Sequence, residues 1–180
     1  MGIESERKFL VHNDVWRTDA VSSHRIRQGF LSTDPERVVR IRVTDNSTGP
    51  AATGLVTTGP ATTGLITIKG ARSGMSRPEF EYPVPAAEAV EMLEQLCLPG
   101  VIDKVRHVCT PQGPAEYELT VDEFAGANHG LVLAEVEYRA LPADPSDRGA
   151  LPRWLGPEVT EDGRYANAAL AVHPYREFAP

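Results

Sequence analysis

Short segments in which apolar and polar residues alternate make up most of the 180-residue chain. Clusters of Gly, Pro, Asn and Asp separate them, which is the pattern of strands joined by turns. Eight strands are predicted, over residues 3–11, 24–32, 37–45, 64–70, 77–83, 102–110, 115–123 and 131–139. The order of these segments predicts a meander in which successive strands are antiparallel.

Helical spacing of apolar residues interrupts this alternation in three places. In "VPAAEAVEMLEQLC" the apolar residues recur at helical spacing from Ala86 to Cys97, and Pro85 suits the first turn. The stretch "RYANAALAVH" predicts a shorter C-terminal helix at about 164–172, and residues 12–22 predict a further helix. The chain is therefore predicted to be one α+β domain spanning residues 1–180.

A ten-residue duplication lies between two of the predicted strands. "TGPAATGLVT" (Thr48 to Thr57) is followed at once by "TGPATTGLIT" (Thr58 to Thr67). Solenoid architectures need several stacked copies of about 20 or more residues, so the duplication is interpreted as an insertion at about 46–64 that lengthens a hairpin connection. A lid over an entrance is the functional alternative.

Charged residues occupy alternate positions within the predicted strands. Since alternate side chains of a strand face opposite sides, Glu4, Glu6 and Lys8 share one face of the first strand. The same alternation relates Arg40 to Arg42, Arg77 to Glu79 and Glu81, Lys104 to Arg106, Glu118 to Asp122, and Glu135 to Glu137, and it places Lys69 at the end of its strand. The opposite faces are largely apolar and are expected to pack against helices.

Two interpretations fit this charged face. An antiparallel sheet often exposes one face to water, and for a single strand this is the simpler explanation. The recurrence of paired Glu and paired Arg or Lys across the sheet favours a closed eight-stranded barrel, in which inward charges must be paired or bind something. A polyphosphate chelated by a divalent metal carries both signs of charge and matches such an interior.

Charge and composition argue against some classes of binding partner, namely nucleic acid and membranes. The formal net charge of -7 argues against nonspecific binding to nucleic acid or to an anionic membrane. No apolar run approaches the roughly 20 residues that a bilayer requires, and we expect a cytoplasmic protein. Cys97 and Cys109 lack partners at zinc-ligand spacing. The five His residues show no nucleophile partner, and no P-loop is present.

The segment "IESERKFLV" resembles the Glu-x-Glu-x-Lys signature of the CYTH superfamily, also called the triphosphate tunnel metalloenzymes. Further blocks resemble the short bacterial members in the same order, namely "RQGFLSTDPERVVRIRV", "LITIKG", "SRPEFEYPV", "IDKVRH", "YELTVDEFAG", "GLVLAEVEY" and "EVTEDGRYANAALAVHPY". The resemblance implies a closed eight-stranded antiparallel β tunnel with flanking helices. The duplicated stretch departs from it and leaves the shape of one tunnel mouth open.

The resemblance also implies roles for individual residues. The implied triphosphate-binding residues are Lys8, Arg40, Arg42, Lys69, Lys104 and Arg106, and the implied metal ligands are Glu4, Glu6, Glu135 and Glu137. Glu79, Glu81 and Asp122 are the remaining candidates for metal binding or for activating water, and Glu6 and Glu137 join them as candidate catalytic residues. Arg164 resembles a basic residue that closes on the substrate from one end, although a solvated surface Arg is an equal alternative.

The resemblance implies Mg²⁺- or Mn²⁺-dependent hydrolysis of a small-molecule triphosphate, with inorganic tripolyphosphate as the first candidate substrate. The alternatives are a thiamine or nucleoside triphosphatase, a class IV type adenylate cyclase, and a noncatalytic polyphosphate-binding module. Carboxylates that suit metal, beside cations that suit phosphate, favour an enzyme over the module. Either a monomer or a homodimer is compatible with the sequence.

Overall fold

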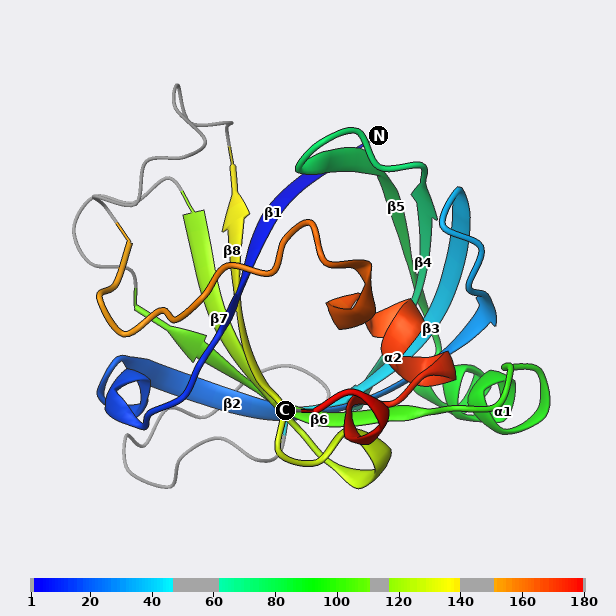
Figure 1. Ribbon diagram of the computed structural model, residues 1–180. Coiled ribbons are helices and arrows are strands. Elements are labelled where there is room, and N and C mark those ends of the chain that lie inside the picture. The colour runs from blue at the N-terminus through cyan, green and yellow to red at the C-terminus, as the bar shows by residue number, and fades with distance from the viewer. Residues whose placement is uncertain (1, 47–61, 111–116, 140–150, 180) are drawn as a thin grey trace.

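The computed structural model describes residues 2–46, 62–110, 117–139 and 151–179. The described strands form a closed antiparallel barrel in the order β1-β5-β4-β3-β2-β6-β7-β8, and Figure 1 shows them encircling a central space. The strands are β1 (Gly2–Leu10), β2 (Ala20–Ser32), β3 (Arg37–Asp45), β4 (Thr62–Gly70), β5 (Ser76–Val84), β6 (Ile102–Cys109), β7 (Tyr117–Phe124) and β8 (Val132–Tyr138). The predicted tunnel architecture is confirmed.

Strand β1 closes the barrel by pairing with two neighbours over different parts of its length. Its first half pairs with β5, with Glu4 opposite Arg77, and its second half pairs with β8, with Lys8 opposite Glu135. The alternation of side chains then turns Glu4, Glu6 and Lys8 toward the interior, as the sequence predicted.

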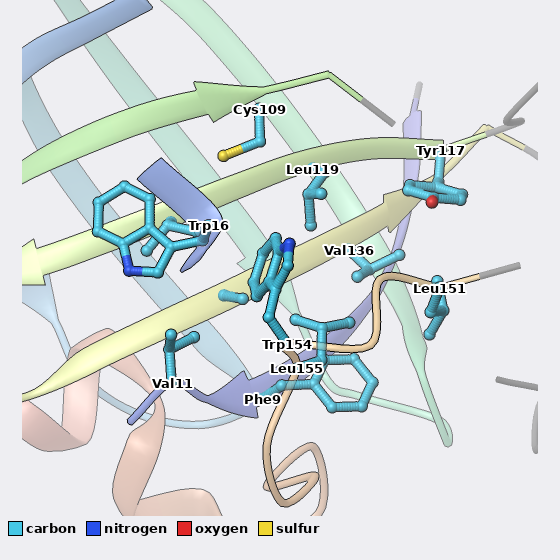
Figure 2. Close-up of a cluster of buried hydrophobic side chains, with 12 residues drawn as sticks. Phe9, Val11, Trp16, Cys109, Tyr117, Leu119, Val136, Leu151, Trp154 and Leu155 are labelled. Carbon is cyan, nitrogen blue, oxygen red and sulfur yellow. The ribbon is translucent and has the colours of Figure 1, made fainter. Parts of the chain in front are cut away.

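Apolar side chains pack on the outside of the barrel. Helix α1 (Ala86–Gln95) begins after Pro85 and buries Ala89 and Leu93 against Ile41 of β3. A larger outer cluster brings Phe9, Trp16 and Trp154 together (Figure 2). Because these cores lie outside, the barrel interior remains available for charged groups.

The C-terminal part of the chain covers one end of the barrel. Helix α2 (Asn167–Val172) lies over this end in Figure 1. Its Leu170 is fully buried in a cluster with Phe30, Ile102 and Phe124, whose strands all begin or end there. The predicted helix at 164–172 is thus a 3₁₀ turn (Gly163–Tyr165) followed by α2.

A segment before this cap runs along the outer edge of β1. The Val159 N–H donates to the Lys8 carbonyl at 2.8 Å, and the Gly156 N–H donates to the Leu10 carbonyl at 2.9 Å. Glu158 accepts two hydrogen bonds from the guanidinium of Arg7, which is 2% exposed. These contacts hold the strand that carries the Glu-x-Glu-x-Lys residues.

The predicted helix over residues 12–22 is wrong. Only Val15–Thr18 form a 3₁₀ turn, and β2 already begins at Ala20, four residues before its predicted start. Residues 62–64, predicted to belong to the insertion, begin β4, and residues 47–61 lie outside the described residues. No helix in the described ranges is both long enough and apolar enough to span a bilayer.

Candidate active site

A cavity inside the barrel is lined mostly by charged side chains of both signs. Eleven of its lining residues were predicted from the sequence: Glu4, Glu6, Lys8, Arg40, Arg42, Lys69, Glu79, Glu81, Arg106, Glu135 and Glu137. They come from six of the eight strands, so the closure of the barrel brings them together. Ala166, Asn167 and Ala168 complete the wall on the side of α2.

Lys8 is the centre of an ion-pair group on β1 and β8. Its Nζ lies 2.6 Å from Glu135 Oε1 and 2.9 Å from Glu6 Oε2, and the side chain is nearly fully buried. Burial by itself lowers the Lys8 pKa, but Glu135 and Glu6 more than offset this and raise that pKa above its ordinary value. Lys8 is therefore a permanent cation in the tunnel wall.

Glu4 forms a second group with cations from β4 and β5. Its two carboxylate oxygens each lie 2.6 Å from a cation, Lys69 Nζ on one side and Arg77 Nε on the other. Burial raises the Glu4 pKa, but Lys69 and Arg77 outweigh burial and lower that pKa to about 2. Lys69 also lies 3.1 Å from Glu79 Oε1.

Asp122 and Lys104 form a buried ion pair behind the cavity wall. Lys104 Nζ lies 2.5 Å from Asp122 Oδ2, and both side chains are completely buried. Asp122 also accepts two hydrogen bonds from Arg106, at 2.7 Å each, and Arg106 further pairs with Glu135. Neither Lys104 nor Asp122 lines the cavity, so they support Arg106, which does.

Arg42 differs from the other cations in lacking a counter-ion. Arg40 donates to Thr67 at 2.8 Å and lies 3.4 Å from Glu81, whereas Arg42 forms no side-chain hydrogen bond or ion pair with any residue that the structure describes. Burial, together with Arg40 and Arg106, lowers the Arg42 pKa to about 9. Arg42 thus presents an uncompensated positive charge to the cavity.

Glu137 is the corresponding uncompensated anion. It lies directly opposite Glu6 on β1 and Glu118 on β7, and like charges in such cross-strand positions are destabilising. Burial, with Glu4 and Glu79 as the next contributions, raises the Glu137 pKa to about 7. No ion pair to Glu137 exists within the described part of the chain.

The carboxylate oxygens around Glu137 have the chemistry of ligands for a hard divalent cation. Among the residues described, no three acidic, His or Cys side chains are already arranged to hold a metal ion. Glu4 and Glu6 are instead paired with cations, including Arg72 Nη2 at 2.8 Å from Glu6 Oε1. The donor set fits Mg²⁺ or Mn²⁺ in chemistry, and a bound ion would exchange places with these cationic partners.

Two cations of the cavity were absent from the predicted site. Arg77 lies on the same inward face of β5 as Glu79 and Glu81, so alternation along the strand predicts its position. Arg72 lies in the connection between β4 and β5, where alternation gives no information. In contrast, the predicted residue Arg164 does not line the cavity, because its side chain is 60% exposed and pairs with Asp162 at 2.6 Å.

Comparison with known proteins agrees with this geometry. The CYTH domain matches residues 2–150. The inorganic triphosphatase of Acetivibrio thermocellus is 39% identical over 178 residues, which cover 99% of each chain, and that of Nitrosomonas europaea is 32% identical over 169 residues, which cover 94% of this chain and 97% of the relative. A crystal structure of an inorganic triphosphatase aligns with a TM-score of 0.56 and 30% identity, covering 94% of this chain and 97% of its own. The chain therefore belongs to the CYTH domain family.

Proposed function

We propose that this protein is a metal-dependent triphosphatase that hydrolyses inorganic tripolyphosphate to pyrophosphate and phosphate. One observation carries the proposal. Arg42 and Glu137, which are the uncompensated cation and anion of the described barrel, face the same charged cavity. Only a ligand that brings both signs of charge satisfies both, and a polyphosphate with a divalent metal does so. The two full-length relatives, both inorganic triphosphatases, support the same reaction.

The cations of the cavity are proposed to hold the phosphoryl oxygens. Phosphoryl transfer requires little covalent chemistry from a protein, so catalysis depends on alignment and on stabilising charge in the transferred group. Arg42 and Arg106 provide planar guanidinium donors for this, and Lys8 provides a point charge from the opposite wall. Arg40 and Lys69 complete the proposed phosphate-binding set. Lys104, the remaining candidate, is proposed to support this set from behind the wall, through Asp122 and Arg106.

The carboxylates of the opposite wall are proposed to hold the metal. The proposed ligands are Glu4, Glu6, Glu135 and Glu137, and Asp122 is a further candidate whose present partners are Lys104 and Arg106. When bound, Mg²⁺ or Mn²⁺ would neutralise phosphate charge and lower the pKa of a coordinated water. Glu79 and Glu81 line the cavity beside these ligands and are proposed to orient the attacking water.

Several features favour tripolyphosphate over an organic triphosphate. The cavity end next to α2 is walled by Phe30, Val38 and the small residues Ala166 and Ala168. Hydrogen-bonding groups that recognise a base are sparse there, with Asn167 as the polar side chain of that wall. Arg164 is proposed to stay outside the binding set unless α2 and its preceding turn move.

The test is a phosphate-release panel on the purified protein. Tripolyphosphate, pyrophosphate, ATP and thiamine triphosphate are each incubated with Mg²⁺, with Mn²⁺, and with EDTA, and cyclic AMP is measured for ATP. The proposal predicts that tripolyphosphate has the highest kcat/KM and that EDTA abolishes its turnover. Tight tripolyphosphate binding without turnover of any compound would replace the proposal with a noncatalytic binding module.

A further inference from the structure

Gln28 lies in the tunnel wall beside the uncompensated Arg42. On β2 it is directly opposite Arg42 of β3 and Ile102 of β6. Phe30, two residues further along the same strand, lines the cavity, so alternation turns the Gln28 side chain toward the barrel interior as well. An uncharged amide therefore lies inside the barrel, directly opposite a charged residue of the cavity wall.

Both polar atoms of this amide are without a partner. The Gln28 side chain is fully buried, and neither Oε1 nor Nε2 forms a hydrogen bond with any residue the structure describes. Buried polar side chains almost always have a partner, so an amide with none calls for a specific explanation. Its neighbour on β6 is the apolar Ile102, and the next inward residue there, Lys104, is already held by Asp122.

Arg42, the cross-strand neighbour of Gln28, has an unpaired hydrogen-bond donor. Arg42 Nε is likewise buried without an acceptor. A glutamine amide offers an acceptor oxygen, so the Gln28 side chain is able to accept a hydrogen bond from the guanidinium Nε of Arg42. This pairing satisfies two of the three orphaned atoms, Gln28 Oε1 and Arg42 Nε, when an anion draws the guanidinium into place.

We propose that Gln28 is a substrate-positioning residue for the triphosphate. Gln28 does not itself line the cavity, so it acts through Arg42. Its Oε1 accepts a hydrogen bond from Arg42 Nε, which aims the terminal fork of the guanidinium at the phosphate. The inference rests on the proposed function for the identity of the anion. Gln28 is thus a neutral positioning residue behind the charged phosphate-binding set.

The experiment replaces Gln28 by Met, which has similar length and shape but no amide. Thermal unfolding in EDTA is measured with and without tripolyphosphate, and kcat and KM are measured with Mg²⁺. We expect the ligand-free Q28M protein to be at least as stable as wild type, because the buried orphaned amide is gone. The tripolyphosphate-induced rise in Tm shrinks, and KM increases about tenfold while kcat changes less.

A second variant separates positioning from a purely structural role. In an Arg42→Met background, Q28M has no further effect on the tripolyphosphate-induced Tm rise, because Gln28 acts beside Arg42. Lower ligand-free stability of Q28M with unchanged KM and unchanged Tm rise would overturn the proposal, as would full additivity with Arg42→Met. Gln28→Leu repeats the test if Q28M does not fold. The Tm measurement needs no turnover, so it stands apart from the hydrolysis assay that tests the proposed function.

Discussion

Replacing Glu137 by Gln is predicted to stabilise the metal-free protein and to remove its metal-dependent activity. The Glu137 pKa is raised from 4.5 to about 7 in the folded state by burial and by the surrounding carboxylates. The folded state therefore binds this proton more tightly than the unfolded state does. Folding stability falls as pH rises from about 4.5 to 7, and the full cost is present above pH 7.

The size of this effect follows from the same pKa difference. A rise from 4.5 to about 7 corresponds to about 3 kcal/mol. Because the Glu137 side chain remains partly exposed, solvent screening reduces the expected cost to about 1–2 kcal/mol. Glu137→Gln removes this cost, so we expect its Tm to exceed that of wild type by about 3–6 °C at pH 8 and to match it near pH 4.

The assay is thermal unfolding followed by circular dichroism, in EDTA, at intervals from pH 4 to pH 9. Glu94→Gln is the matched control, because Glu94 is exposed on α1 far from the cavity wall. A Glu137→Gln variant that is no more stable than wild type at pH 8, or whose Tm advantage does not change with pH, would refute the electrostatic reasoning. Undiminished phosphate release by this variant with Mg²⁺ would refute its role as a ligand.

Three further substitutions test a proposed metal ligand, an exposed arginine and an ion pair behind β1. Glu6→Gln lowers Mg²⁺-dependent turnover of tripolyphosphate by about 100-fold or more, measured as kcat, because a direct metal ligand is lost; a change under threefold contradicts the assignment. Arg164→Ala changes kcat/KM by less than about threefold, because Arg164 forms an exposed ion pair with Asp162 outside the cavity. A larger loss would indicate that Arg164 contacts the substrate. Glu158→Gln lowers the free energy of unfolding by about 2 kcal/mol in urea, since it removes the carboxylate charge that lies 2.6 Å from the buried Arg7 cation, while KM is retained. Unchanged stability would contradict this.

The strands and the inward face were predictable because alternation determines both. Once Glu4, Glu6 and Lys8 are assigned to one face, closure of the barrel requires the like-facing residues of the other strands to meet them. The helix at α1 was predictable for a similar reason, since its apolar residues recur at one period and Pro85 marks its start.

Other features depend on contacts that a sequence pattern does not record. Trp16 and its neighbours suggested a helix, but Trp16 is buried against the outer core from a 3₁₀ turn. The pairing of Lys104 with Asp122 depends on which charges meet in three dimensions, and so does the absence of a partner for Arg42. Gln28 carries no charge, so the alternation of charged residues does not distinguish it from other strand residues.

The most direct test of the central claim is ³¹P NMR of tripolyphosphate incubated with the wild-type protein and Mg²⁺. We expect tripolyphosphate resonances to be replaced by those of pyrophosphate and phosphate in equal molar amounts, and EDTA to stop the reaction. Turnover that continues in EDTA, or a tripolyphosphate spectrum that stays unchanged with Mg²⁺ and with Mn²⁺, would contradict it.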